Sequence, residues 1–219
     1  MQSDIKPKER PILLNAEMVR AVLEGRKTQT RRIVKDVPTT HDFHGWILSS
    51  TSIKDEGKAC WAIGKSPLLN QPIRVRCQFG AVGDRLWVRE KTRVDLLLSN
   101  RRAHVRYEAD GAYQIVPIPE RIKPMEDGRC MSNGCYREAS RITLEITGVR
   151  VERLNSLSES DALAEGCNGG HNSIPGYMYS ATPHEHFHHI WETIYGAESW
   201  QANPWVWVIE FKRLEGEYA

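Results

Sequence analysis

The stretch Arg141-Ile-Thr-Leu-Glu-Ile-Thr147 alternates apolar with polar or charged side chains. Because successive side chains of a strand point to opposite faces of a sheet, Ile142, Leu144 and Ile146 are predicted to share one face. A second run of the same kind follows Gly148 and covers residues 149–154. This is the clearest sheet signal in the chain, and it predicts a fold organised by β-structure.

Other segments carry weaker strand signals. Gly83-Asp84 predicts a turn before Arg85-Leu-Trp-Val-Arg89, which alternates in the same way. Strands are also predicted over residues 103–107, over residues 113–117 and over the aromatic and β-branched run at residues 204–212. Residues 36–75 mix Gly, Ser, Pro and scattered Trp without a period, so we expect little regular structure there.

Three helices are predicted from their start signals. Asn15 is a suitable N-cap for residues 16–24, after which Gly25 would end the helix. Ser158, with Asp161 in a capping box, opens residues 158–165. Thr182 and Pro183 open a third helix. Several strands, few helices and no βαβ rhythm predict an α+β fold, with a small closed or partly closed barrel and helices packed on it.

Length and composition favour one globular domain. The chain has 219 residues, of which 40% are hydrophobic and 26% charged. The N-terminus is polar and lacks a long apolar run, so we expect a cytoplasmic protein without a membrane partner. The five cysteines are odd in number and irregularly spaced, which favours reduced thiols over a disulfide framework.

Charge is distributed unevenly along the chain. Residues 151–219 hold ten acidic and three basic side chains, although the whole chain has a formal net charge of +2. Such asymmetry fits a basic surface that attracts polyanions beside an acidic flank. It also fits two solvated faces of opposite sign, and the sequence leaves both readings open.

The densest basic stretch is Leu23-Glu-Gly-Arg-Lys-Thr-Gln-Thr-Arg-Arg32, which combines four cations with two hydroxyls. It starts where the first predicted helix ends and runs into a loop or a strand. The carbonyl groups at a helix C-terminus favour cations, which alone could account for Arg26 and Lys27. The two hydroxyls require another explanation.

Three separated segments together resemble the ASCH domain, a family of the PUA-like superfamily. They are Gly25-Arg-Lys-Thr-Gln-Thr30, Gly83-Asp84-Arg-Leu-Trp-Val88, and the group formed by residues 142–154, 157–165 and 208–212. The resemblance implies a single domain over residues 1–219: a PUA-like β-barrel with flanking helices and long insertions near residues 36–75, 91–140 and 167–180. Longer ASCH proteins of phages and prophages are similar in this respect.

The resemblance also implies a cleft that contains Lys27, Thr30 and Glu165. A small bacterial branch of the family hydrolyses N4-acetylcytidine with a lysine, a threonine three residues later and a glutamate in a later helix. Carried onto this chain, Lys27 would accept a proton, Thr30 would be the nucleophile and Glu165 would donate a proton. A threonine hydroxyl needs such a neighbouring base to become an effective nucleophile.

The basic residues around this cleft are candidates for substrate or nucleic-acid contacts. Arg31 stands where the small enzymes carry an apolar residue, which favours a nucleotide or RNA over a free nucleoside. The other candidates, with Trp87 as a stacking platform, are Arg26, Arg32, Arg89 and Arg141. The expected partner is therefore a nucleoside, a nucleotide or RNA. Two alternatives to hydrolysis stay open: RNA or modified-base binding without chemistry, and cleavage of RNA.

The run His184-Glu-His-Phe-His188 matches the H-E-x-x-H pattern of zinc peptidases. Glu185, however, stands where a capping box with Thr182 would use it, and no third ligand follows downstream. We therefore expect neither a designed metal site nor a cofactor, although the histidines could hold a metal non-specifically.

Overall fold

The computed structural model describes residues 6–35, 37–64, 72–123, 126–131 and 134–215. These residues form two compact units, each built from separated parts of the chain. The first unit takes its residues from Met1–Lys27, Gly83–Ile146 and Phe211–Ala219, and the second from Thr28–Val82 and Thr147–Glu210. The chain passes repeatedly from one unit to the other.

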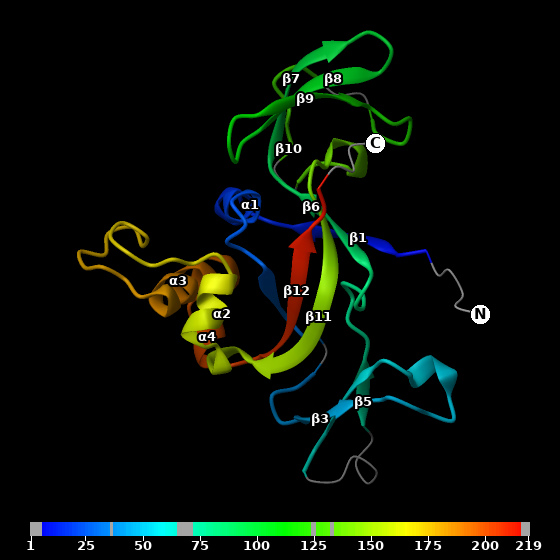
Figure 1. Cartoon of the computed structure of the whole chain (residues 1–219), viewed down its shortest axis with the longest axis vertical. Helices are drawn as coiled ribbons and strands as arrows, with labels where there is room; N and C mark the ends of the chain where they lie inside the picture. The colour runs from blue at the N-terminus through cyan, green and yellow to red at the C-terminus, as the bar shows by residue number, and fades with distance from the viewer. Residues whose placement is uncertain (1–5, 36, 65–71, 124–125, 132–133, 216–219) are drawn as a thin grey trace. The chain divides into compact units, whose positions relative to one another are not determined.

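The strands form three sheets (Figure 1). The largest has the order β1-β6-β11-β12-β2 and consists of β1 (Glu9–Leu13), β6 (Arg85–Arg89), β11 (Thr143–Arg153), β12 (Trp205–Arg213) and β2 (Gln29–Ile33). β1 pairs with β6 in parallel, and β6 with β11 antiparallel. Two smaller sheets have the orders β10-β7-β8-β9 and β3-β4-β5.

The strongest sheet signal of the sequence is confirmed. Ile142, Leu144 and Ile146 are at most 1% exposed, and residues 85–89 form β6 as predicted. The two runs on either side of Gly148 form one continuous strand, because β11 runs through this residue. A Cβ atom at Gly148 would lie 2.5 Å from a carboxylate oxygen of Glu210, so glycine serves close packing here and not a turn.

The helix starts are confirmed by their caps. Asn15 accepts from the backbone of Met18 at the start of α1 (Ala16–Leu23), and Gly25 has a φ of +75° just after it. Ser158 and Asp161 form a capping box on α2 (Glu159–Ala164). The remaining helices are α3 (Pro183–Tyr195), α4 (Glu198–Gln201) and three short 3-10 helices at Ile53–Asp55, Arg137–Ala139 and Leu154–Ser156.

The prediction of little regular structure over residues 36–75 is wrong for the described part of that segment. β3 (Asp42–Trp46), β4 (Ala59–Ala62) and β5 (Ile73–Val75) form an antiparallel sheet in the second unit. Each strand is short and β3 contains a register shift after Phe43, so no periodicity was visible. Aromatic contacts hold this sheet, since the Trp61 ring lies 5.8 Å from Trp207.

The predicted insertion at residues 91–140 contains the four-stranded antiparallel sheet of the first unit. It consists of β7 (Thr92–Leu98), β8 (Arg102–Tyr107), β9 (Tyr113–Pro117) and β10 (Cys130–Met131). The strands at residues 103–107 and 113–117 were predicted, and β7 and β10 were not. Val94, Val105, Val116 and Ala139 bury a small core of its own.

The second unit has a separate helical core. Figure 1 shows α2, α3 and α4 gathered together, and Leu154, Phe187, Trp191 and Val208 pack among them. The α+β class is therefore established. Among the described residues none of the three sheets closes on itself into a barrel. None of the five cysteines, all of which are described, forms a disulfide bond, and no described helix is long and apolar enough to cross a membrane.

Candidate functional site

Strand β2 carries the second half of the basic stretch and lies at an edge of the largest sheet. It pairs antiparallel with β12, with Arg31 opposite Val208 and Thr30 opposite Ile209. Because side chains alternate along a strand, Gln29 and Arg31 share one face of β2, and Thr30 and Arg32 share the other. The strand therefore separates neighbouring polar residues into two different environments.

Arg31 points into a group of carboxylates. Its side chain has no exposed area, and its Nη2 atom lies 3.0 Å from Glu152 and 3.3 Å from Asp161. Its Nη1 atom lies 3.4 Å from Glu165, whose side chain is only 2% exposed. A guanidinium group can serve several carboxylates at once because its donors form a planar fork.

Helix α2 is held against β2 by three kinds of contact. The backbone N–H of Thr28 donates to the carbonyl of Ala164 at 2.8 Å. The side chain of Gln29 donates to Asp161 at both the backbone carbonyl, 3.1 Å, and the carboxylate, 3.0 Å. Together with the Arg31 ion pairs, these bonds place the end of α2 beside the basic stretch, so Glu165 and Thr30 belong to neighbouring segments.

Thr30 is fully buried, and its hydroxyl oxygen accepts a hydrogen bond of 2.7 Å from Nη1 of Arg32. The same nitrogen donates to the backbone carbonyl of Arg31 at 2.8 Å. A hydroxyl group has two lone pairs and one proton, so this bond leaves the Thr30 proton able to pass to a base. A cation beside the oxygen also stabilises negative charge on it.

Arg150 extends the network along β11. It pairs with Glu152 at 2.5 Å, with Asp161 at 2.9 Å and with Glu210. Burial opposes ionisation of Asp161, but hydrogen bonds from Ser158 and Gln29 and the charge of Arg31 outweigh it and hold the Asp161 pKa well below its ordinary value. The aspartate that caps α2 is thus an ionised partner of both arginines.

Arg26 and Lys27 belong to the first unit. Lys27 is 2% exposed, and its backbone N–H donates to the carbonyl of Ala21 at 3.0 Å. Arg26 pairs with Glu24 at 2.5 Å on the partly exposed end of α1. Lys27 immediately precedes Thr28, which begins the second unit.

Two of the predicted phosphate contacts are turned away from solvent, which corrects the expectation for them. Arg31 has no exposed side-chain area and forms ion pairs with Glu152 and Glu165. Arg141 is 7% exposed and pairs with Glu90 and Asp110, each at 2.8 Å. Both arginines pair with acidic residues that are distant in the sequence. The local sequence around each arginine therefore could not reveal these partners.

The two remaining residues that were predicted to contact substrate or nucleic acid lie on β6 in the first unit. Trp87 and Arg89 are both half-buried there. Arg89 lines a pocket with residues of the four-stranded sheet segment. Neither residue belongs to the unit that contains Thr30 and Glu165.

The histidines at the start of α3 have structural contacts. Glu185 accepts from the backbone N–H of Thr182 at 2.7 Å, as a capping box requires, so the predicted local role of this glutamate is confirmed. His184 and His188 pack their rings against Trp200. Within the described ranges no group of three or more His, Cys, Asp or Glu side chains could hold a metal ion.

Sequence reasoning missed three partners in this site, namely Gln29, Arg150 and Glu152. Arg150 and Glu152 occupy alternate positions of β11 and therefore share a face, a pattern that was visible in the sequence. Comparisons with models of protein families, with curated proteins and with solved structures found no match for this chain. The residues themselves are therefore the basis for a functional assignment.

Proposed function

We propose that the protein is an ASCH-type hydrolase of PUA-like ancestry that removes the acyl group from N4-acetylcytidine or a related modified nucleoside. The observation that supports this most is the Thr30 hydroxyl, which is fully buried and accepts a 2.7 Å hydrogen bond from the Arg32 guanidinium. An ordinary surface threonine has neither feature. The buried carboxylate of Glu165, fixed by Arg31, lies in the neighbouring segment.

In the proposed reaction the Thr30 oxygen attacks the acyl carbon of the amide while Lys27 accepts the hydroxyl proton. The bond between the acyl carbon and the N4 atom then breaks, and Glu165, a carboxylate at rest, takes up the proton held by Lys27 and passes it to the leaving nitrogen. This gives cytidine and an ester on Thr30, which water hydrolyses to a carboxylic acid. Arg32 stabilises negative charge on the Thr30 oxygen during the attack.

The roles of the two arginines differ in this proposal. Arg32 donates to the reacting oxygen and so acts on the chemistry directly. Arg31 acts through Glu165, because its ion pairs with Glu152 and Asp161 fix the guanidinium that the Glu165 carboxylate contacts. Arg31 is therefore a positioning residue.

The test is release of cytidine from N4-acetylcytidine by the purified protein, separated by liquid chromatography. We expect Thr30→Ala to lower the turnover number by at least about a thousandfold, since single removals of a nucleophile cost this much or more. Thr30→Ser, which keeps the hydroxyl, should retain measurable activity. Glu165→Gln should also lose most of the turnover.

Thr28→Ala is the matched control. Thr28 is the same residue type, lies two positions before Thr30 and is exposed, and its bond to Ala164 uses only the backbone. Its turnover should equal that of the unchanged protein. An inactive wild-type protein, or a Thr30→Ala variant as active as Thr28→Ala, would show that Thr30 is not a nucleophile for this substrate.

A further inference from the structure

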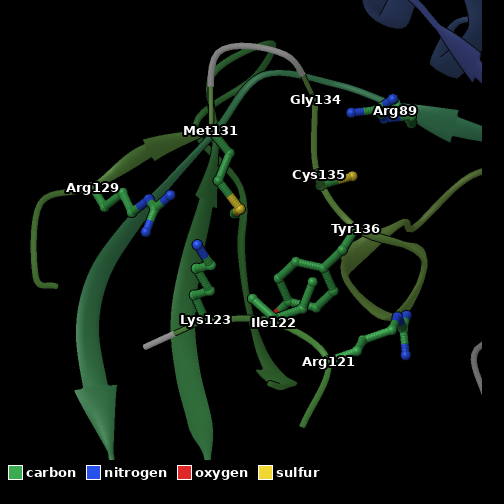
Figure 2. A pocket seen from close by; sticks show the side chains of 9 residues that line it. All are labelled: Arg89, Arg121, Ile122, Lys123, Arg129, Met131, Gly134, Cys135 and Tyr136. Carbon is green, nitrogen blue, oxygen red and sulfur yellow. The ribbon is translucent and has the colours of Figure 1, made fainter. Parts of the chain in front are cut away.

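A second polar site lies in the first unit and contains none of the residues of the proposed hydrolase. This site is a pocket with a volume of about 340 Å³, and Figure 2 shows the side chains that line it. Its lining comprises Arg89, Arg121, Ile122, Lys123, Arg129, Met131, Gly134, Cys135 and Tyr136. Small-molecule sites usually begin at about 300 Å³, so the pocket suits a ligand of modest size.

The charges of this pocket are unbalanced. Four of its described lining residues are cationic and none is acidic. Arg121 is paired, since it donates to both carboxylate oxygens of Glu138 at 2.8 and 2.5 Å. Figure 2 shows the Lys123 ammonium and the Arg129 guanidinium directed towards the same space near Met131. Two like charges that converge in this way repel each other, and an anion between them relieves the repulsion.

Nearby acidic side chains do not balance these two cations. Asp127 lies just before Arg129, but its carboxylate accepts the backbone N–H of Leu97 at 2.7 Å. Glu126 and Asp127 do not line this pocket but a separate hollow, together with Gly128 and Arg129. In the part of the chain that the structure describes, neither Lys123 nor Arg129 forms an ion pair.

The other side of the pocket is apolar and held in place. The Tyr136 hydroxyl donates to the carbonyl of Pro117 at 2.9 Å, which fixes its ring. Ile122, Met131 and Tyr136 pack on the buried core of the four-stranded sheet. Gly134 must stay small, because a Cβ atom there would lie 2.7 Å from Cβ of Arg89. A ligand of this pocket would therefore combine an anionic group with a flat or apolar part.

We propose that this pocket binds a nucleotide by its phosphate group, with Lys123 and Arg129 as the phosphate contacts and Ile122, Met131 and Tyr136 beneath the sugar or base. Phosphate suits this pair because guanidinium and ammonium groups make strong charge-assisted hydrogen bonds to it. The inference does not rest on the proposed hydrolysis, because none of the residues proposed for that reaction, Lys27, Thr30, Arg32 and Glu165, lines this pocket.

Binding is measured by calorimetry with three ligands: cytidine monophosphate, cytidine, and an unmodified single-stranded RNA hexamer. We expect cytidine monophosphate to bind saturably and cytidine to bind at least about tenfold more weakly, as loss of a charge-assisted contact implies. Binding of the hexamer but not of the mononucleotide would assign the phosphate to an RNA chain. Equal binding of cytidine and its monophosphate, or no binding of any of the three, would overturn the proposal.

The variants Lys123→Gln and Arg129→Gln should each weaken binding of the phosphorylated ligand about tenfold, and Lys123→Arg should restore most of it. Arg102→Gln is the matched control, since Arg102 is an exposed cation of β8 in the same unit and does not line the pocket. An equal loss in the control would mean non-specific attraction and contradict the site. Cytidine release by the Lys123→Gln variant should stay unchanged, which separates a failure here from a failure of the proposed hydrolase.

Discussion

Replacing Arg31 with methionine tests whether the buried ion-pair group holds the second unit together. Methionine fills a similar volume but removes the charge that faces Glu152, Asp161 and Glu165. We expect a large loss of stability, and its size follows from how exposed each carboxylate is. The side chains of Glu152 and Asp161 are 25% and 19% exposed, and both keep Arg150 as a partner.

Glu165 differs from the other two carboxylates because its side chain is 2% exposed. Breaking a buried pair by removing one partner costs about 3–5 kcal/mol, since the remaining charge stays away from water. We expect about 3 kcal/mol for Arg31→Met, mostly from Glu165. For a chain of this length that corresponds to a fall in melting temperature of about 6–12 °C.

The assay is urea unfolding followed by tryptophan fluorescence, with Arg102→Met as an exposed control that should change stability by less than about 0.5 kcal/mol. The double variant Arg31→Met/Glu165→Gln also removes the buried negative charge that Arg31→Met leaves without a partner. Its free energy of unfolding should therefore be at least about 1 kcal/mol higher than that of Arg31→Met alone. If Arg31→Met unfolded within about 1 kcal/mol of the unchanged protein, or if the double variant showed no recovery, the Arg31–Glu165 ion pair would not be what stabilises this unit.

Two further predictions concern the same unit. Because the pKa of Asp161 is held below its ordinary value in the folded protein, its contribution to stability is present above about pH 4 and is lost as the pH falls further. The urea midpoint should therefore drop more steeply below pH 4 in the unchanged protein than in Asp161→Asn, and parallel curves would contradict this. Gly169→Ala should destabilise by more than about 2 kcal/mol, because φ is +67° and a Cβ atom would lie 2.4 Å from the carbonyl oxygen of Ala181. Gly170→Ala, with a φ of +96° and open space around the new atom, should cost at least about 1 kcal/mol less in the same unfolding assay, and equal costs would count against the predicted clash.

Elements with local signals were predictable from the sequence. The capping boxes of α2 and α3 depend on residues three apart, and the alternation of β6 lies within five residues. The sheet β3-β4-β5 was not predictable in this way. Its strands are three to five residues long, and Trp61 and Phe43 are held by Trp207 and Trp205 from the other end of the chain.

The candidate site was also predictable only in part, because some of its contacts join residues that are far apart in the sequence. The sequence placed Thr30 and Glu165 in segments that the resemblance brings together, and the structure puts these segments side by side. The side chain direction of Arg31 could not be predicted, because a run of cations fits either face of a strand. Its carboxylate partners lie more than one hundred residues away in the chain.

The neighbouring arginines of the basic stretch therefore make different contacts, which composition alone does not reveal. Strand alternation sends Arg31 to the carboxylates and Arg32 to the Thr30 hydroxyl, so these neighbouring arginines are not interchangeable. A cation that is already neutralised gives little attraction to a phosphate, whereas Lys123 and Arg129 converge on an open pocket. The two proposed activities should accordingly separate by mutation, with Thr30 and Arg32 governing hydrolysis and Lys123 and Arg129 governing nucleotide affinity.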